Sequence, residues 1–440
     1  MTMHQGLTPR LRPLPPRRSA TLSVLDVGTS KVVCLVAELL PAEESSLLPG
    51  RTHLARVIGI GHQRSAGLKG GVIVDLEAAE AAIRGAVHAA ERMAKVEIRS
   101  VIVNLTGGRL GSLRHAGHAP VRGGPVTAAD LHRACDAAGA RGVPPNRVVL
   151  HALPTAYSLD AQGGIVDPTG MVGEALGVDL HMVTAEAAAA RNLMLAVERC
   201  HLGIEAVIAT PYAAGLSALA EDEAEMGCAV IDLGGGTTSV GVFARGHLVH
   251  TDALAVGGHH VTMDLARGLS TRVATAERLK TMHGACVSSA ADERDMIAVP
   301  TVDEDERETS SHLPKSHLVR IIRPRVEEIL ELARDRLRAA GFADQAGRRV
   351  VLTGGGSQLV GLPDTARRIL EGGVRIGRPL GIKGLPEAAK GPAFSASVGL
   401  LVYPQVAHAE HAEPRSGGAY QATGTDGYLA RVGRWFRESF

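Results

Sequence analysis

Two segments of the chain each place a single carboxylate between an apolar run and a turn of glycines and hydroxyl residues. The first segment carries Asp26 and continues with Gly28, Thr29, Ser30 and Lys31. The second carries Asp232 and continues with Gly234, Gly235, Gly236, Thr237 and Thr238. An apolar extended pattern resumes after each turn, so each segment is predicted to be the tip of a β-hairpin.

These residue types suit a phosphate that carries a metal ion. Glycines let backbone N–H groups approach an anion closely, and hydroxyl groups add further donors. A carboxylate alone would repel a phosphate, so Asp26 and Asp232 make sense if Mg²⁺, held through water, lies between them and the phosphates. The pattern occurs once in each half, which predicts two similar α/β domains that bind one phosphate chain from opposite sides. For either segment taken alone, a glycine-rich hairpin without a ligand remains the alternative.

Other phosphate motifs are absent from the sequence. Neither the Walker pattern nor the dinucleotide fingerprint, both of which open a helix, occurs at these turns. A third apolar strand does end in Gly354, Gly355, Gly356 and Ser357 and precedes a helix, whose start could accept a base or ribose. Glu277 and Lys280 lie on one face of a predicted helix, and by themselves they indicate only a surface ion pair.

Composition sets the broad class. A chain of 440 residues with 45% hydrophobic and 21% charged residues is expected to form two or more soluble domains. A formal net charge of +1 gives no reason to expect a nucleic-acid partner. The 5 cysteines are scattered without a Cys-x-x-Cys pair, which indicates neither a zinc site nor a disulfide framework and fits a reducing compartment. No run of 18 apolar residues occurs, so no membrane-spanning helix is expected.

Motif order and composition divide the chain into segments. A glycine- and proline-rich stretch interrupts the first half, and we expect it to be an inserted subdomain. We also expect a helix over residues 184–201, a mobile loop over 284–316 and a helix over 319–337 that breaks near Pro324. The expected segments are a disordered basic tail (1–20), a first core domain (21–110 and 182–228), the insertion (111–181), a second core domain (229–267 and 341–402), a small subdomain (268–340), a flexible linker (403–427) and a terminal helix (428–440).

The terminal helix is predicted to be amphipathic. Its apolar side carries Leu429, Val432, Trp435, Phe436 and Phe440, and its opposite side carries Arg431, Arg434 and Arg437. A basic face opposite aromatic anchors is typical of a helix that lies in a membrane interface. Docking of this helix on the protein's own core is the alternative, against which the long polar linker argues.

Taken together, the three glycine segments resemble the nucleotide signatures of the actin/Hsp70 ATPase superfamily. Within that superfamily the chain is similar to the FtsA family of bacterial actin-like cell-division proteins. The features that carry this second resemblance are Gly257-Gly258 before the helix that ends in Gly268-Leu269-Ser270-Thr271, the pattern Ala276-Glu277-x-x-Lys280, the insertion and the terminal helix. The resemblance covers roughly residues 20–440.

This resemblance implies an actin-like ATPase fold, in which two RNase H-like domains flank a nucleotide cleft. ATP and Mg²⁺ would bind between the halves, with Gly257 among the nucleotide contacts and with Glu277 and Lys280 facing the ribose and adenine. The insertion would mediate self-association into filaments and recruit later divisome proteins. The small subdomain would dock the C-terminal peptide of FtsZ, with Arg325 as the candidate contact. The terminal helix would attach the FtsZ polymer to anionic lipid on the cytoplasmic face of the inner membrane, at the division septum.

The same comparison predicts slow ATP turnover or none. Hydrolysing relatives often carry an acid that positions the attacking water, and Thr210 stands at that point here. Three other functions are alternatives: a sugar-kinase-like phosphotransferase, a chaperone-like ATPase and a pilus-assembly ATPase with the same insertion. The first would need a catalytic Asp and a substrate pocket in the first half, and residues 111–181 show no such motif. The second would need a substrate domain after residue 402. The terminal helix argues for the division protein over the pilus ATPase.

Overall fold

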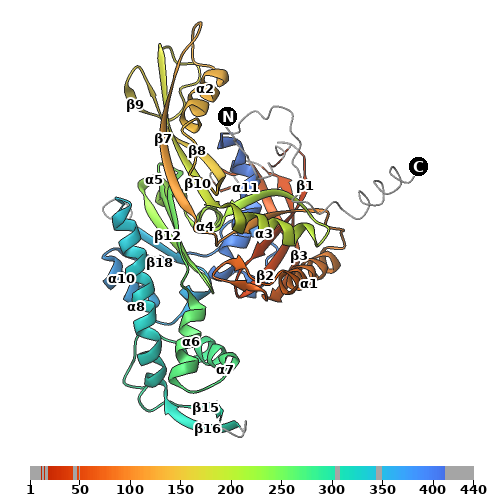
Figure 1. Ribbon diagram of the computed structural model, residues 1–440, viewed down its shortest axis with the longest axis vertical. Coiled ribbons are helices and arrows are strands. Elements are labelled where there is room, and N and C mark those ends of the chain that lie inside the picture. Colours follow the sequence, from red (N-terminus) through yellow and green to blue (C-terminus); the bar gives the residue numbers. More distant parts are fainter. Residues whose placement is uncertain are drawn as a thin grey trace, which may run out of the picture.

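A computed structural model describes residues 11, 14, 18–42, 47–48, 50–302, 308–342 and 349–411. Two sheet-based core domains lie side by side at the centre, and a smaller subdomain extends from each end of this pair (Figure 1). Most of the basic tail, the greater part of the linker and the whole terminal helix predicted for 428–440 lie outside the described residues. Within the described ranges, none of the helices combines the length and apolar character that crossing a bilayer requires.

The first core domain is built on a six-stranded sheet in the order β11-β6-β1-β2-β3-β19. Strands β1 to β3 form an antiparallel meander, whereas β6 and β11 run parallel to β1 on its other side. Their Val-, Leu- and Ile-rich segments are buried because helices cover the sheet. The strands are β1 (Ala20–Val27), β2 (Lys31–Pro41), β3 (His53–Arg64), β6 (Ser100–Leu105), β11 (Gly203–Ala209) and β19 (Ile382–Lys383), with a short hairpin of β4 (Leu68–Lys69) and β5 (Val72–Ile73).

The second core domain repeats this plan. Its sheet has the order β14-β13-β12-β17-β18, in which β12 to β14 form the meander and β17 and β18 run parallel to β12. The strand that carries Asp232 is therefore the counterpart of the strand that carries Asp26, as the duplicated hairpin predicted. The strands are β12 (Cys228–Leu233), β13 (Thr238–Ala244), β14 (His247–Leu254), β17 (Arg349–Thr353) and β18 (Gly373–Ile376).

Helices of the core domains pack on these sheets. Helix α1 begins at an Asp75 cap, whose side chain accepts a hydrogen bond from the Ala78 N–H. The helices are α1 (Leu76–Ala94), α3 (Ala187–Glu198), α4 (Thr210–Ala218), α5 (Glu221–Met226), α10 (Leu362–Leu370) and α11 (Ser395–Val406), with short 3₁₀ turns η2 (Gly355–Gln358), η3 (Glu387–Ala389), η4 (Pro392–Phe394) and η5 (Ala407–Ala409). The helix expected from residue 184 begins only at Ala187, because β10 continues to Glu186.

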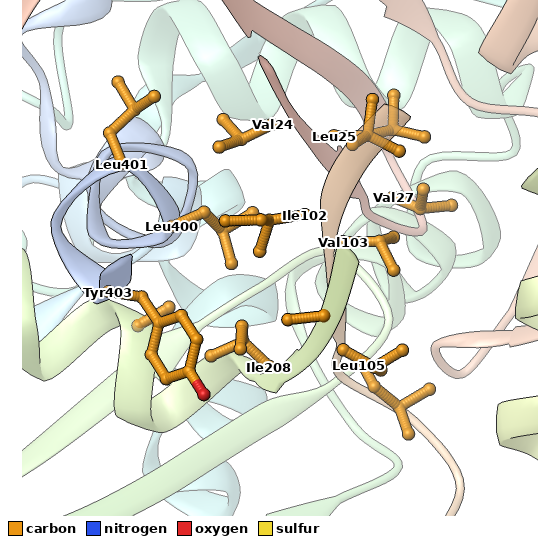
Figure 2. Packing of buried hydrophobic residues seen from close by; sticks show 14 of the residues in the cluster. Val24, Leu25, Val27, Ile102, Val103, Leu105, Ile208, Leu400, Leu401 and Tyr403 are labelled. Atoms are coloured by element: carbon orange, nitrogen blue, oxygen red, sulfur yellow. The ribbon is translucent and has the colours of Figure 1, made fainter. Parts of the chain in front are cut away.

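Helix α11 returns the C-terminal part of the chain to the core of the first domain. Leu400, Leu401 and Tyr403 pack there against β1, β6 and β11 (Figure 2). Tyr403 is buried, and the chain continues through η5 to His411. The predicted start of the linker at residue 403 is therefore too early. Polar composition suggested a flexible segment there, but Tyr403 and its neighbours in α11 pack against apolar residues.

The inserted subdomain is an antiparallel sheet in the order β7-β10-β8-β9 with one helix against it and a small apolar core of its own. Its elements are β7 (Gly111–Pro120), α2 (Ala128–Gly139), β8 (Arg147–Leu159), β9 (Gln162–Ile165) and β10 (Ala175–Glu186). Side chains of this subdomain bind the backbone of β14 in the second core domain. Ser112 accepts from the Thr251 N–H at 2.7 Å, and His181 Nδ1 lies 2.8 Å from the Leu248 carbonyl oxygen.

The small subdomain at the other end consists of α6 (Gly258–Gly268), α7 (Val273–His283), the hairpin β15 (Met296–Val302) and β16 (Glu308–Pro314), and α8 (Lys315–Ala339). Two expectations were wrong here. The polar segment expected to be a loop contains the β15–β16 hairpin. Helix α8 also runs through Pro324 without ending, because buried Ile322, Val326 and Ile329 offset the backbone hydrogen bond that proline cannot make.

Candidate functional site

The tips of the two acidic hairpins touch. A Cβ atom added at Gly235 would lie 2.9 Å from Ser30 Cβ, and one added at Gly236 would lie 2.5 Å from Thr29 Oγ1. Only glycine allows such an approach, which explains the glycine run of the second turn. The structure thus brings Asp26 and Asp232, from opposite halves of the chain, to one site.

The third glycine turn lies beside Asp232. Gly354 has a φ of 81°, and a Cβ atom there would lie 2.1 Å from Asp232 Oδ1. The start of α6 also closes on the second turn, because the Gly258 N–H donates to the Gly234 carbonyl at 2.9 Å and the His259 N–H donates to the Gly235 carbonyl at 2.7 Å. All three glycine segments that the sequence singled out therefore converge on the Asp232 hairpin.

Asp26 is held in a fixed orientation. Asn104 Nδ2 donates to its Oδ1 at 2.7 Å, and Ser397 Oγ donates to its Oδ2 at 2.5 Å. Burial raises the pKa of Asp26, and the hydrogen bond from Ser397 and the charge of Lys31 oppose that shift. Asn104 also accepts from the Val27 N–H at 2.7 Å, so β6 and β1 share this contact.

Asp232 has a different environment. Among the described residues no group donates a hydrogen bond to its carboxylate, although the residue is only 8% exposed. Burial, together with the negative charge of Asp26, raises the pKa of Asp232 to about 7, while Lys31 acts in the opposite direction. A buried carboxylate without donors is costly, so this group favours a cation.

Lys31 is the cation that both aspartates share. Its Nζ donates to the Ala393 carbonyl at 2.6 Å and lies 3.6 Å from the centre of the Phe394 ring. Burial lowers its pKa, and the charges of Asp26 and Asp232 raise it. One lysine facing two buried carboxylates leaves excess negative charge, which a divalent cation would neutralise. In the part of the chain that the structure describes, no three His, Cys, Asp or Glu side chains group as metal ligands, so Mg²⁺ would keep water and phosphate oxygens as ligands.

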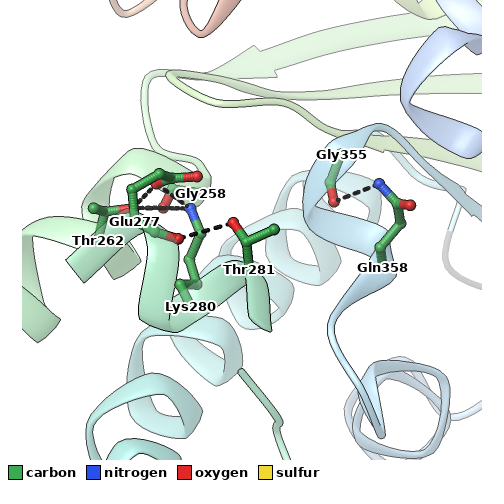
Figure 3. A network of polar contacts seen from close by, with 7 residues as sticks. All are labelled: Gly258, Thr262, Glu277, Lys280, Thr281, Gly355 and Gln358. Atoms are coloured by element: carbon green, nitrogen blue, oxygen red, sulfur yellow. Dashed lines mark hydrogen bonds and ion pairs between the residues drawn. The ribbon is translucent and has the colours of Figure 1, made fainter. Parts of the chain in front are cut away.

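Glu277 and Lys280 join a polar cluster at the junction of α6 and α7. Lys280 Nζ donates to Glu277 Oε2 at 2.8 Å, to Thr262 Oγ1 at 2.8 Å and to the Gly258 carbonyl at 3.0 Å. Figure 3 shows this cluster opposite the Gly355–Gln358 turn. The pair is therefore more than a surface ion pair, because it connects α7 to the α6 start that closes on the second hairpin.

Some site residues were missed from the sequence. Asn104 and Ser397 both donate hydrogen bonds to Asp26. Asn104 carried a usable signal, as the one polar residue in the apolar run 101–105. Ser397 carried none, because nothing in its local sequence places α11 beside β1.

Residues predicted to bind partners lie away from this site or outside the described ranges. Arg325 Nε donates to Asp264 Oδ2 at 2.6 Å, and its Nη1 pairs with Glu328. Its guanidinium is thus already engaged by two carboxylates. The membrane-facing residues of 428–440 lie outside the described residues.

The two matched sheets, with acidic hairpins meeting between them, define an actin-like ATPase fold. Among solved structures the chain is similar to the "PilM-PilN type IV pilus biogenesis complex" (TM-score 0.60, 16% identity, 88% of this chain and 99% of that chain). It is also similar to MreB5 of Spiroplasma citri bound to AMPPNP (TM-score 0.50, 16% identity, 90% of this chain and 98% of that chain). These likenesses confirm the predicted fold class.

Sequence comparison narrows the class to one family. Residues 229–399 match the family "Cell division protein FtsA", and residues 107–184 match "SHS2 domain inserted in FTSA". The chain is 55% identical to a "Cell division protein FtsA" from Rhizobium meliloti (strain 1021), over 98% of both chains. It is 32% identical to the protein of that name from Escherichia coli (strain K12), over 94% of this chain and 97% of that protein. The chain belongs to the FtsA family of cell-division proteins, which confirms the family resemblance seen in its sequence.

Proposed function

We propose that this cell-division protein binds Mg·ATP between its two acidic hairpins. The observation that supports this most is Asp232, a buried carboxylate without a donor, beside a second buried carboxylate and one lysine. Bound Mg²⁺ would neutralise charge between the carboxylates and the phosphates. Lys31 and the hydroxyls of Thr29, Ser30 and Thr237 are the side chains available to the phosphates. Thr238 was expected among them, but it is fully buried and its hydroxyl donates to the Val256 carbonyl at 2.8 Å. Gly257, Glu277 and Lys280 are the residues nearest the proposed nucleoside side.

Replacement of Asp232 tests this site. Asp232→Ala should abolish Mg·ATP binding, measured by calorimetry, whereas Asp335→Ala removes a carboxylate with a 61% exposed side chain and should bind normally. An unchanged ATP affinity in Asp232→Ala would refute the assignment.

The nucleotide is proposed to act as a conformational and polymerisation switch with little turnover. Thr210 is 2% exposed, and its hydroxyl contacts Asn104 and, at 2.7 Å, Thr106 Oγ1. A neutral hydroxyl engaged in this way is a poor general base. Steady-state turnover should therefore fall far below about 10 per second, the median of ordinary enzymes, and a rate near that value would contradict the proposal.

We further propose that the protein polymerises and tethers FtsZ filaments to the inner membrane at the septum, and that the inserted subdomain recruits later divisome proteins. The amphipathic pattern of residues 428–440 supports lipid attachment. Co-sedimentation with vesicles of anionic and zwitterionic lipid tests it. Equal binding by the full chain and by a chain lacking residues 428–440 would rule the tether out.

Docking of the FtsZ C-terminal peptide on the small subdomain, with Arg325 as a contact, is the remaining part of the proposal. Arg325 could reach an acidic peptide only by exchanging Asp264 or Glu328 for the peptide carboxylate. The Arg325→Ala change should weaken peptide binding, and the same affinity in both proteins would remove this residue from the interface. The pilus-assembly alternative rests only on a fold likeness at 16% identity, against 55% for the division relatives.

A further inference from the structure

His151 is the point at which three distant parts of the chain meet. It stands on β8 of the inserted subdomain, its side chain is fully buried, and its ring packs edge-on against Tyr212 of α4 and Tyr403 of α11 at 5.0 and 5.8 Å between ring centres. The Ala209 N–H donates to Nε2 at 3.0 Å. Nε2 is therefore an acceptor, so Nδ1 carries the proton and donates to Glu410 Oε1 at 3.0 Å.

The contact with Glu410 fixes the segment that follows α11. The next residue, His411, donates its N–H to the Ala152 carbonyl at 2.8 Å, and its Nε2 lies 3.0 Å from Asp136 Oδ1 on α2. Residues 412–440 continue from this point. The place from which that segment departs is thus attached to β8 and α2 of the inserted subdomain.

Two chains of contacts connect the His151–Glu410 contact to the phosphate site. Along one, Ala209 is followed by Thr210, whose hydroxyl lies 3.1 Å from Asn104 Nδ2, and Asn104 donates to Asp26. Along the other, α11 begins where Ser397 donates to Asp26 and ends at Val406, a helix of 12 residues. At 1.5 Å per residue it spans about 18 Å. Asp26, α11, Glu410, His151 and Asn104 therefore form a closed ring of contacts.

We propose that α11 and the His151–Glu410 contact couple the phosphate site to the departure point of residues 412–440. Residues 395–405 of α11 are all buried, so a displacement at Ser397 is passed along the helix instead of being absorbed by loose packing. At the far end, the Glu410 side chain is 12% exposed, and without His151 it would be a nearly buried, unpaired carboxylate. A partly broken His151–Glu410 contact would therefore be unfavourable. The contact is either made or lost, and these are the two states that coupling requires.

This inference rests on the proposed Mg·ATP binding, and its test separates the two. Calorimetry of the full chain reports nucleotide affinity, while hydrogen exchange of the peptide covering residues 403–411 reports the departure point. We expect Mg·ATP to slow exchange there by about fivefold or more in wild type, the lower range of allosteric coupling. Glu387→Ala is the matched control, because Glu387 is an 88% exposed carboxylate of the same part of the chain.

Glu410→Ala should bind Mg·ATP with wild-type affinity within about threefold yet show less than about a twofold exchange response. Glu410→Gln keeps an acceptor for His151 Nδ1 and should retain the response. If Glu410→Ala does not fold, Asp136→Asn weakens the neighbouring His411 contact from the surface of α2 and should reduce the response. Two results would overturn the coupling alone. In the first, wild type binds Mg·ATP but the hydrogen exchange of residues 403–411 does not change. In the second, Mg·ATP slows that exchange equally in wild type and Glu410→Ala. Loss of binding in wild type would overturn the proposed function and the coupling with it.

Discussion

The charge of Asp232 should make the nucleotide-free protein less stable as pH rises. Its pKa is raised from 3.8 to about 7 in the folded state, so between these values the folded protein holds a proton that the unfolded chain has lost. The contribution of Asp232 to stability is therefore greatest below its pKa in the unfolded chain. That contribution is lost as pH rises toward its pKa in the folded protein. Roughly three pKa units correspond to about 4 kcal/mol. That figure is an upper limit, because Asp26, Asp232 and Lys31 titrate together, and we expect about 1–3 kcal/mol.

The Asp232→Asn change keeps the shape of the side chain and removes its charge. Thermal unfolding should be compared at pH 5, where Asp232 is protonated, and at pH 8, where it is ionised. The Tm of the variant relative to wild type should rise by about 2–12 °C between these pH values, at about 2–4 °C per kcal/mol. Asp335→Asn, at an exposed position, should follow wild type throughout. Parallel curves for Asp232→Asn and wild type would refute the electrostatic account of the site, whatever the absolute Tm of the variant.

The remaining predictions concern the ligand. Mg·ATP should bind more weakly as pH falls below about 7, by up to about tenfold per pH unit, because Asp232 must lose its proton before Mg²⁺ binds. Calorimetry in buffers of different ionisation enthalpy should detect the released proton, and equal binding heats in all buffers would contradict this prediction. Lys280→Met should lower the affinity for ATP about tenfold but leave the affinity for inorganic triphosphate unchanged, since Lys280 belongs to the proposed nucleoside side. Equal losses of affinity for both ligands would place Lys280 at the phosphates instead. Ser397→Ala removes one donor to Asp26 and should weaken Mg·ATP by about fivefold, equivalent to about 1 kcal/mol, as a titration would show.

How far the sequence predicted this molecule depends on whether a feature is local. The acidic hairpins, their duplication and the Gly354–Gly356 turn were visible because glycine and carboxylate are required at adjacent positions of one strand and turn. The β15–β16 hairpin and the unbroken α8 were missed because partners elsewhere in the fold decide them. Pro324 predicts a break by itself, and only the buried side chains on both sides of it reverse that prediction. Ser397 shows the same limit, because its role follows from a contact with Asp26, at the other end of the sequence.

The attachments of the inserted subdomain constrain how the two halves can move. By sequence it belongs to the first half, yet Ser112 and His181 bind the backbone of β14 in the second. His181 is buried, and burial lowers its pKa to about 3, so it stays neutral and keeps this contact at physiological pH. If nucleotide changes the angle between the halves, the subdomain must either follow the second half or break these contacts. In the first case β8 shifts relative to α11, and the strain falls on His151 and Glu410, where the inserted subdomain meets the chain that follows α11.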